Sequence, residues 1–378
     1  MDALTTPSNW QRVRLGDIAE IIGGGTPSTQ VTSFWNGSIN WFTPTEIGIT
    51  KYVHKSQRTI TPLGLKKSSA KLLPIGTILL TSRASIGDCA ILKVVATTNQ
   101  GFQSLIPLEK INNEFLYYLM LTLKNKLLEL ASGSTFLEVS PNKIKNLLIP
   151  LPPLNEQIAI ANILSDVDRY LYSLDALILK KESVKKALSF ELLSQRKRLK
   201  GFNQAWQRVR LGDVANYLTS NLSAEQITQQ GKIKVYDVND FIGYTNTTFI
   251  SDKPYISIVK DGSVGRVRIL PPKTNILSTM GALIANHKTT TEFLFYLLSN
   301  FDFKNFTSGS IIPHIYFKDY KEKTIFLPPL NEQIAIANIL SDLDSEIISL
   351  KNKKRQFDNI KKALNHDLMS AKIRVLKK

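Results

Sequence analysis

No group of residues in this sequence is arranged for catalysis. Gly23-Gly24-Gly25 is the one dense glycine run, and the Lys-Ser/Thr pair that a phosphate-binding loop requires does not follow it. The four histidines show no metal-ligand spacing. Asp319-Tyr320-Lys321 matches only the tail of a nuclease motif, because no Pro-Asp precedes it. Neither an F-x-G-x-G cofactor loop nor an N/D-P-P-F/Y methylation motif is present, so we predict that the chain is not an enzyme by itself.

Two pairs of carboxylates recur on segments that we predict to be helical, Asp166 with Asp168 and Asp342 with Asp344. Residues two apart on a helix do not share a face, so neither pair can work as an acid and its base. We expect these side chains to be solvated or salt-bridged.

Positive charge is the distinctive property of the chain. The 378 residues include 48 Lys and Arg against 31 Asp and Glu, which gives a net charge of +17. Such an excess attracts a polyanion, most commonly nucleic acid. No apolar stretch approaches the roughly 18 residues that span a bilayer, and no secretory signal opens the sequence. The single cysteine, Cys89, excludes an intrachain disulfide, so we expect a soluble protein of the reducing cytoplasm without a membrane partner.

The candidate DNA contacts are basic, hydroxyl and amide side chains on predicted loops and turns. Phosphate contacts position a protein on DNA and base-edge contacts specify the sequence, with Asn and Gln suited to adenine and Arg to guanine. In the first half of the chain the candidates are Arg58, Lys66, Lys67, Ser68, Ser69, Lys71, Arg83, Ser85, Asn99, Gln100 and Gln103. In the second half they are Lys260, Ser263, Arg266, Arg268, Ser278, Thr279, Ser310 and His314.

The sequence that carries these candidates contains an internal repeat. The octapeptide WQRVRLGD at 10–17 recurs unchanged at 206–213. The segment LPPLNEQIAIANILSDVD at 151–168 recurs at 327–344 with one change, Val167 to Leu343. Among the weaker echoes, Ser85-Ile86-Gly87 resembles Ser263-Val264-Gly265, and Ser132-Gly133-Ser134 matches 308–310. The repeat predicts two similar units in one order.

Each LPPL motif opens a segment of about 38 residues that we predict to be a helix about 55 Å long. The apolar residues follow a heptad spacing that forms one stripe on each helix. The predicted stripe positions are Ile160, Leu164, Val167, Leu171, Leu174, Ile178, Val184, Leu188 and Leu192 in the first copy, and Ile336, Leu340, Leu343, Ile347, Leu350, Phe357, Ile360, Leu364 and Leu368 in the second. Since a helix with one apolar stripe is not stable alone in water, we expect the two to pair as an antiparallel coiled coil, with the halves related by a pseudo-two-fold axis.

The stretches before the helices predict compact domains of mixed α/β class. Strand-like runs lie at 76–81, 90–95, 256–259 and 265–270, and helices are expected at 113–130 and 291–301. We therefore divide the chain into a first domain at 1–150, a helical spacer at 151–200, a second domain at 201–326 and a second spacer at 327–378.

Segments that match between the two halves should bind two copies of the same partner, and segments that differ should bind different partners. The long helices match and the domain interiors differ, which suits a protein with two identical partner subunits and two different DNA half-sites. A recent duplication followed by unequal drift would leave the same pattern.

The repeated motif LPPLNEQIAIA, each time at the start of a long helix, resembles the specificity subunit of type I restriction-modification systems. The Arg-Leu-Gly-Asp sequences at 14–17 and 210–213 resemble the same family, as do the first-domain segments 24–28 (GGTPS), 81–87 (TSRASIG) and 99–102 (NQGF). The second domain departs from this pattern, with NYLTS at 216–220 and STMG at 278–281.

The resemblance implies two target-recognition domains, each reading half of a bipartite site on double-stranded DNA, with an unread spacer set by the helices. It implies assembly with two methyltransferase (modification) subunits, which methylate adenine N6, and with two translocase-nuclease (restriction) subunits. S-adenosylmethionine, ATP and magnesium are expected on those partners and no cofactor on this chain.

Two other classes remain open at this point. One is a coiled-coil adaptor with two ligand-binding domains not specific for DNA, which would show no salt-dependent DNA binding. The other is a fragment of a single-chain modification enzyme, which would require cofactor and methylation motifs that this sequence lacks.

Overall fold

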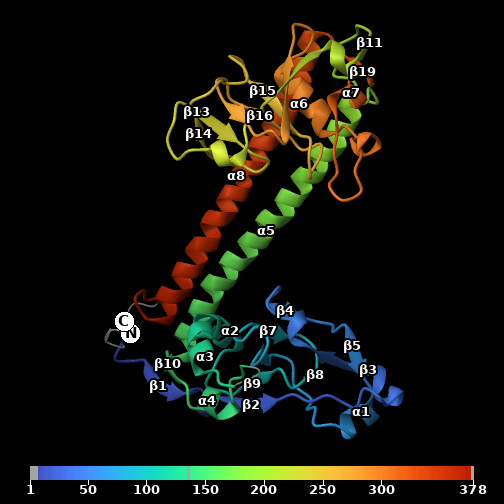
Figure 1. The fold of residues 1–378 in the computed structure, drawn as a ribbon. Helices are drawn as coiled ribbons and strands as arrows, with labels where there is room; N and C mark the ends of the chain where they lie inside the picture. The colour runs from blue at the N-terminus through green and yellow to red at the C-terminus, as the bar shows by residue number, and fades with distance from the viewer. Residues whose placement is uncertain (1–6, 134–136, 376–378) are drawn as a thin grey trace. The chain divides into compact units, whose positions relative to one another are not determined.

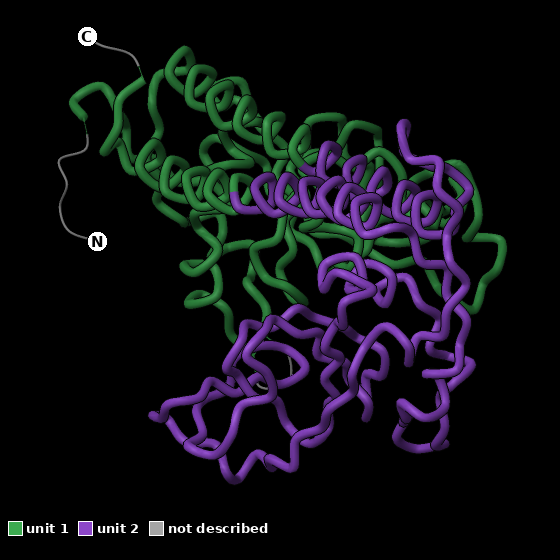
Figure 2. Tube along the Cα trace, turned by 90° about the horizontal axis from the view of Figure 1, so that it is seen from above, with its two compact units in different colours: residues 1–174, 353–378 green, residues 175–352 purple. Residues whose placement is uncertain are grey.

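The computed structural model describes residues 7–133 and 137–375, and the chain forms two compact units (Figures 1 and 2). Unit 1 comprises residues 1–174 and 353–378, and unit 2 comprises residues 175–352. Each unit contains one mixed α/β domain, as the sequence predicts.

Two long helices, α5 (Leu154–Leu193) and α8 (Leu330–Met369), each contribute one section to each unit. Both begin directly after the Pro-Pro pair of the repeated motif and are 40 residues long. No helix in the described part of the chain combines the length and the apolar character needed to cross a membrane.

The domain of unit 1 is built on a five-stranded sheet with the order β2-β9-β6-β7-β4 and a three-stranded sheet with the order β5-β3-β8. The strands are β2 (Ala19–Gly23), β3 (Trp35–Phe42), β4 (Tyr52–Val53), β5 (Arg58–Ile60), β6 (Ile78–Leu80), β7 (Cys89–Leu92), β8 (Ala96–Thr98) and β9 (Gln103–Pro107). The short helices are α1 (Pro62–Lys66), α2 (Asn113–Thr122), α3 (Lys124–Leu130) and α4 (Pro141–Lys145).

The domain of unit 2 repeats this plan with fewer strands. Its sheets have the orders β12-β18-β15-β16 and β14-β13-β17. The strands are β12 (Ala215–Thr219), β13 (Ile233–Tyr236), β14 (Phe241–Thr245), β15 (Tyr255–Val259), β16 (Val267–Leu270), β17 (Asn275–Ile276) and β18 (Met280–Ala285), and the helices are α6 (Thr291–Ser299) and α7 (Phe317–Tyr320). The pairings β2–β9 and β12–β18, β6–β9 and β15–β18, and β6–β7 and β15–β16 are equivalent. Strand β4, at the edge of the first sheet, has no counterpart in the second.

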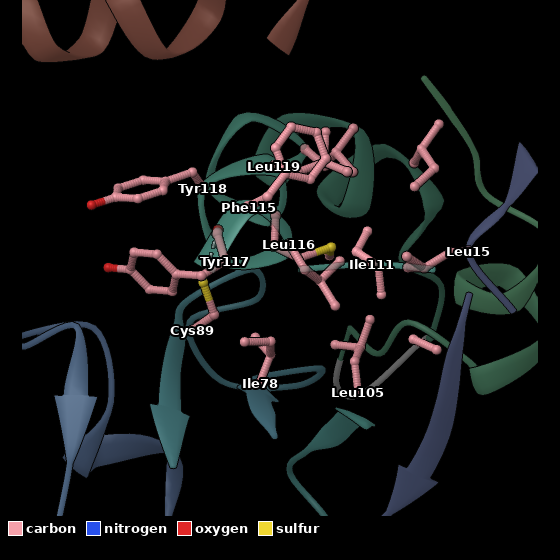
Figure 3. Close-up of a cluster of buried hydrophobic side chains, with 14 of the residues drawn as sticks. Leu15, Ile78, Cys89, Leu105, Ile111, Phe115, Leu116, Tyr117, Tyr118 and Leu119 are labelled. Atoms are coloured by element: carbon pink, nitrogen blue, oxygen red, sulfur yellow. Dashed lines mark hydrogen bonds between the residues drawn. The ribbon is translucent and has the colours of Figure 1, made fainter. Parts of the chain in front are cut away.

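Helix α2 lies at the centre of the unit 1 core. The Asn112 side chain accepts a hydrogen bond from the backbone N–H of Phe115 at 2.9 Å and so caps the helix. Residues 115–120 are all buried, and Figure 3 shows Leu116 and Tyr117 of this helix on the side that faces Ile78 and Leu105 of the sheet. Burial raises the pKa of the Cys89 thiol, which lies in the same cluster, to about 12, so this cysteine is a core residue and not a reactive one.

The two repeated motifs of each half meet in space although they lie far apart in sequence. Strand β1 (Gln11–Arg14) pairs antiparallel with β10 (Leu148–Leu151), and β11 (Gln207–Arg210) pairs in the same register with β19 (Thr324–Leu327). The entry strand of each domain is thus fixed to the strand that runs into its long helix.

A buried glutamate completes this junction. In unit 1 the Trp10 indole Nε1 donates to Glu156 at 3.1 Å, and the Arg374 guanidinium donates to both carboxylate oxygens of Glu156 at 2.8 and 3.1 Å. In unit 2 Glu332 accepts from Trp206 at 3.0 Å and is paired with Arg198 at 2.6 Å. The glutamates are only 2% and 0% exposed, so each is a buried charge that needs its partners.

Within each unit the sections of α5 and α8 run antiparallel. In unit 1 Tyr170 packs on Phe357 with ring centroids 4.7 Å apart, and Asp168 is ion-paired with Lys361 further along α8. In unit 2 Lys181 is paired with Glu346 at 2.8 Å and Lys185 with Asp344 at 2.5 Å. In each unit the contact partners on α8 have lower residue numbers as those on α5 have higher ones, so the two sections are antiparallel.

The predicted apolar stripes are buried or half-buried at every position except two. Ile160, Leu164 and Leu368 are buried in the unit 1 core. Val184 is 44% exposed and Ile360 is 51% exposed, although both fit the heptad. The reason is a shift of the contact face by one residue, because the neighbouring Lys185 and Lys361 turn inward to reach carboxylates on the opposite helix.

The carboxylates that receive these lysines are Asp168 and Asp344, which the sequence led us to expect solvated or salt-bridged. Both are salt-bridged, and Asp168 is 7% exposed. Each also accepts a tyrosine hydroxyl from the adjoining domain, Tyr118 at 2.5 Å and Tyr296 at 2.9 Å. The pairs therefore fix each domain to its own section of helix.

Unit 1 adds a buried cation for which the described part of unit 2 shows no equivalent. Lys51 is 4% exposed, donates to Tyr118 and Ser165 at 2.9 and 2.8 Å, and is ion-paired with Glu114. Desolvation lowers the pKa of this lysine, and the Glu114 carboxylate partly offsets that effect.

The junction glutamates give a direct stability test. Glu156→Gln keeps an acceptor for Trp10 but removes the charge that pairs with Arg374, so we expect a loss of about 1–3 kcal/mol in the stability of unit 1. Hydrogen exchange followed by mass spectrometry should show faster exchange at residues 10–14 and 148–157. The mirror variant Glu332→Gln should act only on 206–210 and 324–333.

Glu346→Gln is the matched control. Glu346 is half exposed, so its pair with Lys181 should contribute no more than about 1 kcal/mol. Unchanged exchange at 10–14 and 148–157 in Glu156→Gln would show that the buried carboxylate does not hold the junction.

Candidate nucleic-acid interface

Three segments of the first domain meet around the glycine-rich loop that follows β2. A Cβ atom on Gly24 would overlap the carbonyl oxygen of Asn99, and one on Gly25 would overlap Ser69. The backbone N–H of Gly25 donates to Thr98 at 2.8 Å. The two glycines therefore allow a close approach that any larger residue would prevent.

Two tryptophans hold the other side of this loop. Trp41 Nε1 donates to the carbonyl of Gly25 at 2.9 Å, and Trp35 Nε1 donates to that of Ser28 at 3.0 Å. The guanidinium of Arg58 lies over the Trp35 ring, 3.8 Å from its centroid. The sequence did not single out these tryptophans, although two Trp residues six apart beside a Gly-Gly loop are a usable signal.

The structure brings many of the predicted first-domain residues to this surface. Ser69 lies against Gly25, and Gln100 accepts a hydrogen bond from Thr26 of the same loop. Asn99 uses its side-chain oxygen for the backbone N–H of Gly101 at 2.9 Å, so it shapes the turn. The exposed candidates are Arg58, Lys66, Lys67, Ser69, Lys71, Arg83, Ser85 and Gln100, and Ser68 and Asn99 are half-buried.

Gln103 is a correction. It lies at the start of β9 opposite Gly23, and its side chain is 6% exposed. The Gln103 side chain points from the strand into the domain, so it is not placed to contact a base edge. Burial increases along this polar segment, from the exposed Gln100 to the buried start of β9 at Gln103.

A turn beside this surface is closed by the same backbone hydrogen bonds in both domains. Gly87 and Gly265 have positive φ values of 90° and 80°, and their N–H groups donate to Thr81 at 3.0 Å and Val259 at 2.9 Å. The next contact is also shared, because the N–H of Ser82 donates to Gly101 and that of Lys260 to Thr279. The echo between Ser85-Ile86-Gly87 and Ser263-Val264-Gly265 therefore marks one scaffold used twice.

The side chains on this shared turn carry opposite charge. In the first domain Arg83 is paired with Glu138 at 3.0 Å, and in the second Asp261 is paired with His314 at 2.6 Å. Glu138 and His314 occupy equivalent places, since each forms a two-way backbone bridge, to Ser132 and Ser308 respectively. Ser134, part of the matching Ser-Gly-Ser echo, lies outside the described residues.

The remaining second-domain candidates form a looser group. Arg268 is bonded to the carbonyl of Asn239 and lies 3.6 Å from the Asp240 carboxylate, and Arg266 reaches the Asn239 side chain at 3.5 Å. The N–H of Ser278 donates to Leu222 at 2.8 Å, which replaces the Gly-Gly contact of the first domain. Ser263, Arg266, Thr279 and Ser310 are exposed, and Lys260, Arg268, Ser278 and His314 are half-buried.

Sequence reasoning missed Glu138, Asp261 and Asn239, which orient the candidate basic residues. Aligning the two halves on their Ser-x-Gly turns and their Ser-Gly-Ser echoes would have placed 83 with 261 and 138 with 314. The contacts of Arg83 with Glu138 and of Asp261 with His314 could not be predicted from the sequence, because about 55 residues separate the two partners in the chain.

The fold and this surface define a class: a protein that presents two similar scaffolds with different polar side chains. The family described as "Type I restriction modification DNA specificity domain" matches residues 7–181 and again residues 203–357. The chain belongs to this family, and its function is the recognition of DNA target sequences in type I restriction-modification.

Full-length relatives agree. The chain is 29% identical to the type I restriction enzyme MjaIX specificity subunit of Methanocaldococcus jannaschii, over 98% of this chain and 94% of that one. It is 30% identical to the putative MjaX specificity subunit of the same organism, over 98% and 95%. The crystal structure of the type I restriction-modification S subunit from M. genitalium has the same fold, with a TM-score of 0.62, 20% identity and 97% of each chain covered.

The charge-swapped pair predicts a double-mutant result. Arg83→Glu should place two carboxylates together and speed amide exchange at Ser132 and Glu138, and Glu138→Arg added to it should restore the pair. We expect a coupling of about 0.2–1 kcal/mol, because both side chains are partly exposed. Additive single effects would mean that the pair does not hold the Ser132–Glu138 bridge, and the bridge between Ser308 and His314 should be unaffected throughout.

Proposed function

We propose that this chain reads a two-part DNA target, with one domain on each half-site and the long helices setting the unread spacer. The observation that carries the proposal is the contrast between scaffold and surface. The two domains share strand pairings and turn hydrogen bonds, but differ in the Gly-Gly loop, the tryptophans and the sign of the charges on the shared turn. Equivalent frames with different side chains suit two different DNA sequences.

The assignment of individual DNA contacts is part of this proposal. We retain the predicted residues other than Gln103 as contacts to phosphates or base edges. We also retain the four-part division at 1–150, 151–200, 201–326 and 327–378, with the sections of α5 and α8 joined as one antiparallel coiled coil. The antiparallel ion pairs within each unit support that arrangement.

The chemistry of methylation and cleavage is assigned to partner subunits in this proposal. Two modification subunits would carry S-adenosylmethionine, and two restriction subunits would carry ATP and magnesium, with no cofactor and no catalytic residue on this chain. The repeat supports a twofold partner stoichiometry, because each unit offers the same helical surface once.

That surface is an apolar stripe at the start of each long helix. Leu154, Ile158 and Tyr172 lie along one face of α5, since 18 residues make five full turns. Their counterparts on α8 are Leu330, Ile334 and Ile348. All six are between 42% and 58% exposed. Apolar residues that recur at equivalent exposed positions suit a partner that binds twice.

The decisive experiment maps methylated adenine across the genome of cells that make this chain and its modification subunit, and of cells that lack this chain. We expect a two-part motif methylated on both strands that disappears without the chain. Exchanging residues 206–326 for those of another family member should change one half of the motif only. An active modification subunit with no two-part motif would favour the adaptor class instead.

The helical stripe has its own test. Leu154→Lys with Ile158→Lys should reduce the complex from two modification subunits to one, as should Leu330→Lys with Ile334→Lys, and native mass spectrometry resolves the difference. The control is Leu179→Lys, because Leu179 is 64% exposed but its counterpart on α8 is Arg355, so one partner cannot use both. Two bound subunits in every variant would exclude this surface.

A further inference from the structure

Arg58 differs from the other candidate arginines in how it is held. Strand pairing places Arg58 opposite Trp41, and its guanidinium carbon lies 3.8 Å from the Trp35 ring centroid and 5.4 Å from that of Trp41. The two rings are 5.0 Å apart at an angle of 88°. The guanidinium therefore stacks on one ring and is bounded by the other.

The platform beneath it is rigid. Trp35 and Trp41 are 8% and 4% exposed, and each indole N–H is bonded to a carbonyl of the glycine-rich loop. A ring that is buried and hydrogen-bonded cannot swing away, so it restricts the plane of the guanidinium above it. Stacking uses the face of the guanidinium and leaves its N–H edge available.

That edge has no partner within residues 7–133 and 137–375. The Arg58 side chain makes no hydrogen bond or ion pair there, whereas Arg83 is paired with Glu138 and Arg268 with Asp240. An exposed, oriented fork of N–H donors without an acceptor is suited to an external pair of acceptors in one plane.

Guanine O6 and N7 form such a pair in the major groove, and a phosphate group is the alternative. A phosphate contact requires charge more than orientation, and the exposed Lys66, Lys67 and Lys71 supply charge on the same domain. The tryptophan platform adds orientation, which a base edge requires and which a phosphate contact, also available to a lysine, does not. Resting on the proposed function, we infer that Arg58 reads a guanine in the half-site of the first domain.

The test is a methylation map of cells that carry Arg58→Lys together with the modification subunit. The variant keeps the charge and loses the bidentate edge. We expect one G·C pair in the first half of the motif to relax, with discrimination at that position falling about 5- to 150-fold. The second half of the motif, read by the other domain, reports that the complex folds and assembles.

Lys110→Arg is the matched control, an exchange of the same two residue types at an exposed position of the same domain outside the proposed interface, and it should leave the motif unchanged. Trp35→Leu should relax the same position as Arg58→Lys, and Trp35→Phe should relax it less because an aromatic face remains. The purified modification complex should bind a duplex with 7-deazaguanine at that position more weakly than the same duplex with guanine. In the Arg58→Lys variant the two duplexes should bind with equal affinity.

Three results would overturn the inference: a first half-site without a G·C pair, an unchanged motif in Arg58→Lys, or equal loss of affinity for every duplex. Each is distinct from failure of the proposed function, in which the wild-type chain itself would direct no two-part motif.

Discussion

A buried carboxylate at the start of each long helix is the interaction on which the rest of the structure depends. Glu156 and Glu332 each join three parts of a unit: the tryptophan before the entry strand, the first turn of one long helix and an arginine beyond the end of the other. A charge excluded from water is stable only if all of its partners are present. The repeated sequences WQRVR and LPPLNEQ are therefore two ends of one junction.

The same logic continues along the helices. Asp168 and Asp344 each bind a lysine from the opposite helix and a tyrosine from the adjoining domain. Such polar contacts contribute less to net stability than apolar packing, but they penalise any slip in register that would leave a charge unpaired. They also explain why Val184 and Ile360 are exposed, since the face that carries Lys185 and Lys361 turns inward in their place. Leu192 and Leu368 close the far ends of the seam within the two domain cores.

Because these buried carboxylates hold each domain to its helices, the side chains on the surfaces of the two domains can differ. The turn closed by Gly87 or Gly265 shares its closing backbone bonds between the two domains, and those bonds involve no side chain. Side chains on the turn can therefore change sign, as Arg83 and Asp261 do, provided that the facing residue changes with them. The glycine-rich loop and its two tryptophans belong to the first domain alone among the described residues, and they give that domain an oriented arginine where the second has arginines bound to Asn239 and Asp240.

The sequence by itself determined the elements whose signals are local or repeated. Pro-Pro pairs and heptad spacing predicted two long helices, strand-like runs predicted strands β6, β7, β15 and β16, and the duplication predicted two similar domains. The charge and the family motifs pointed to DNA. Tertiary structure decided everything that depends on residues distant in the chain: that Trp10 meets Glu156 and Arg374, that Arg83 faces Glu138, and that Gln103 is buried while Arg58 stacks on Trp35. The physical reason is that a side chain's partners, and so its charge state, orientation and exposure, are set by which strands pair, and strand pairing is not written in local sequence.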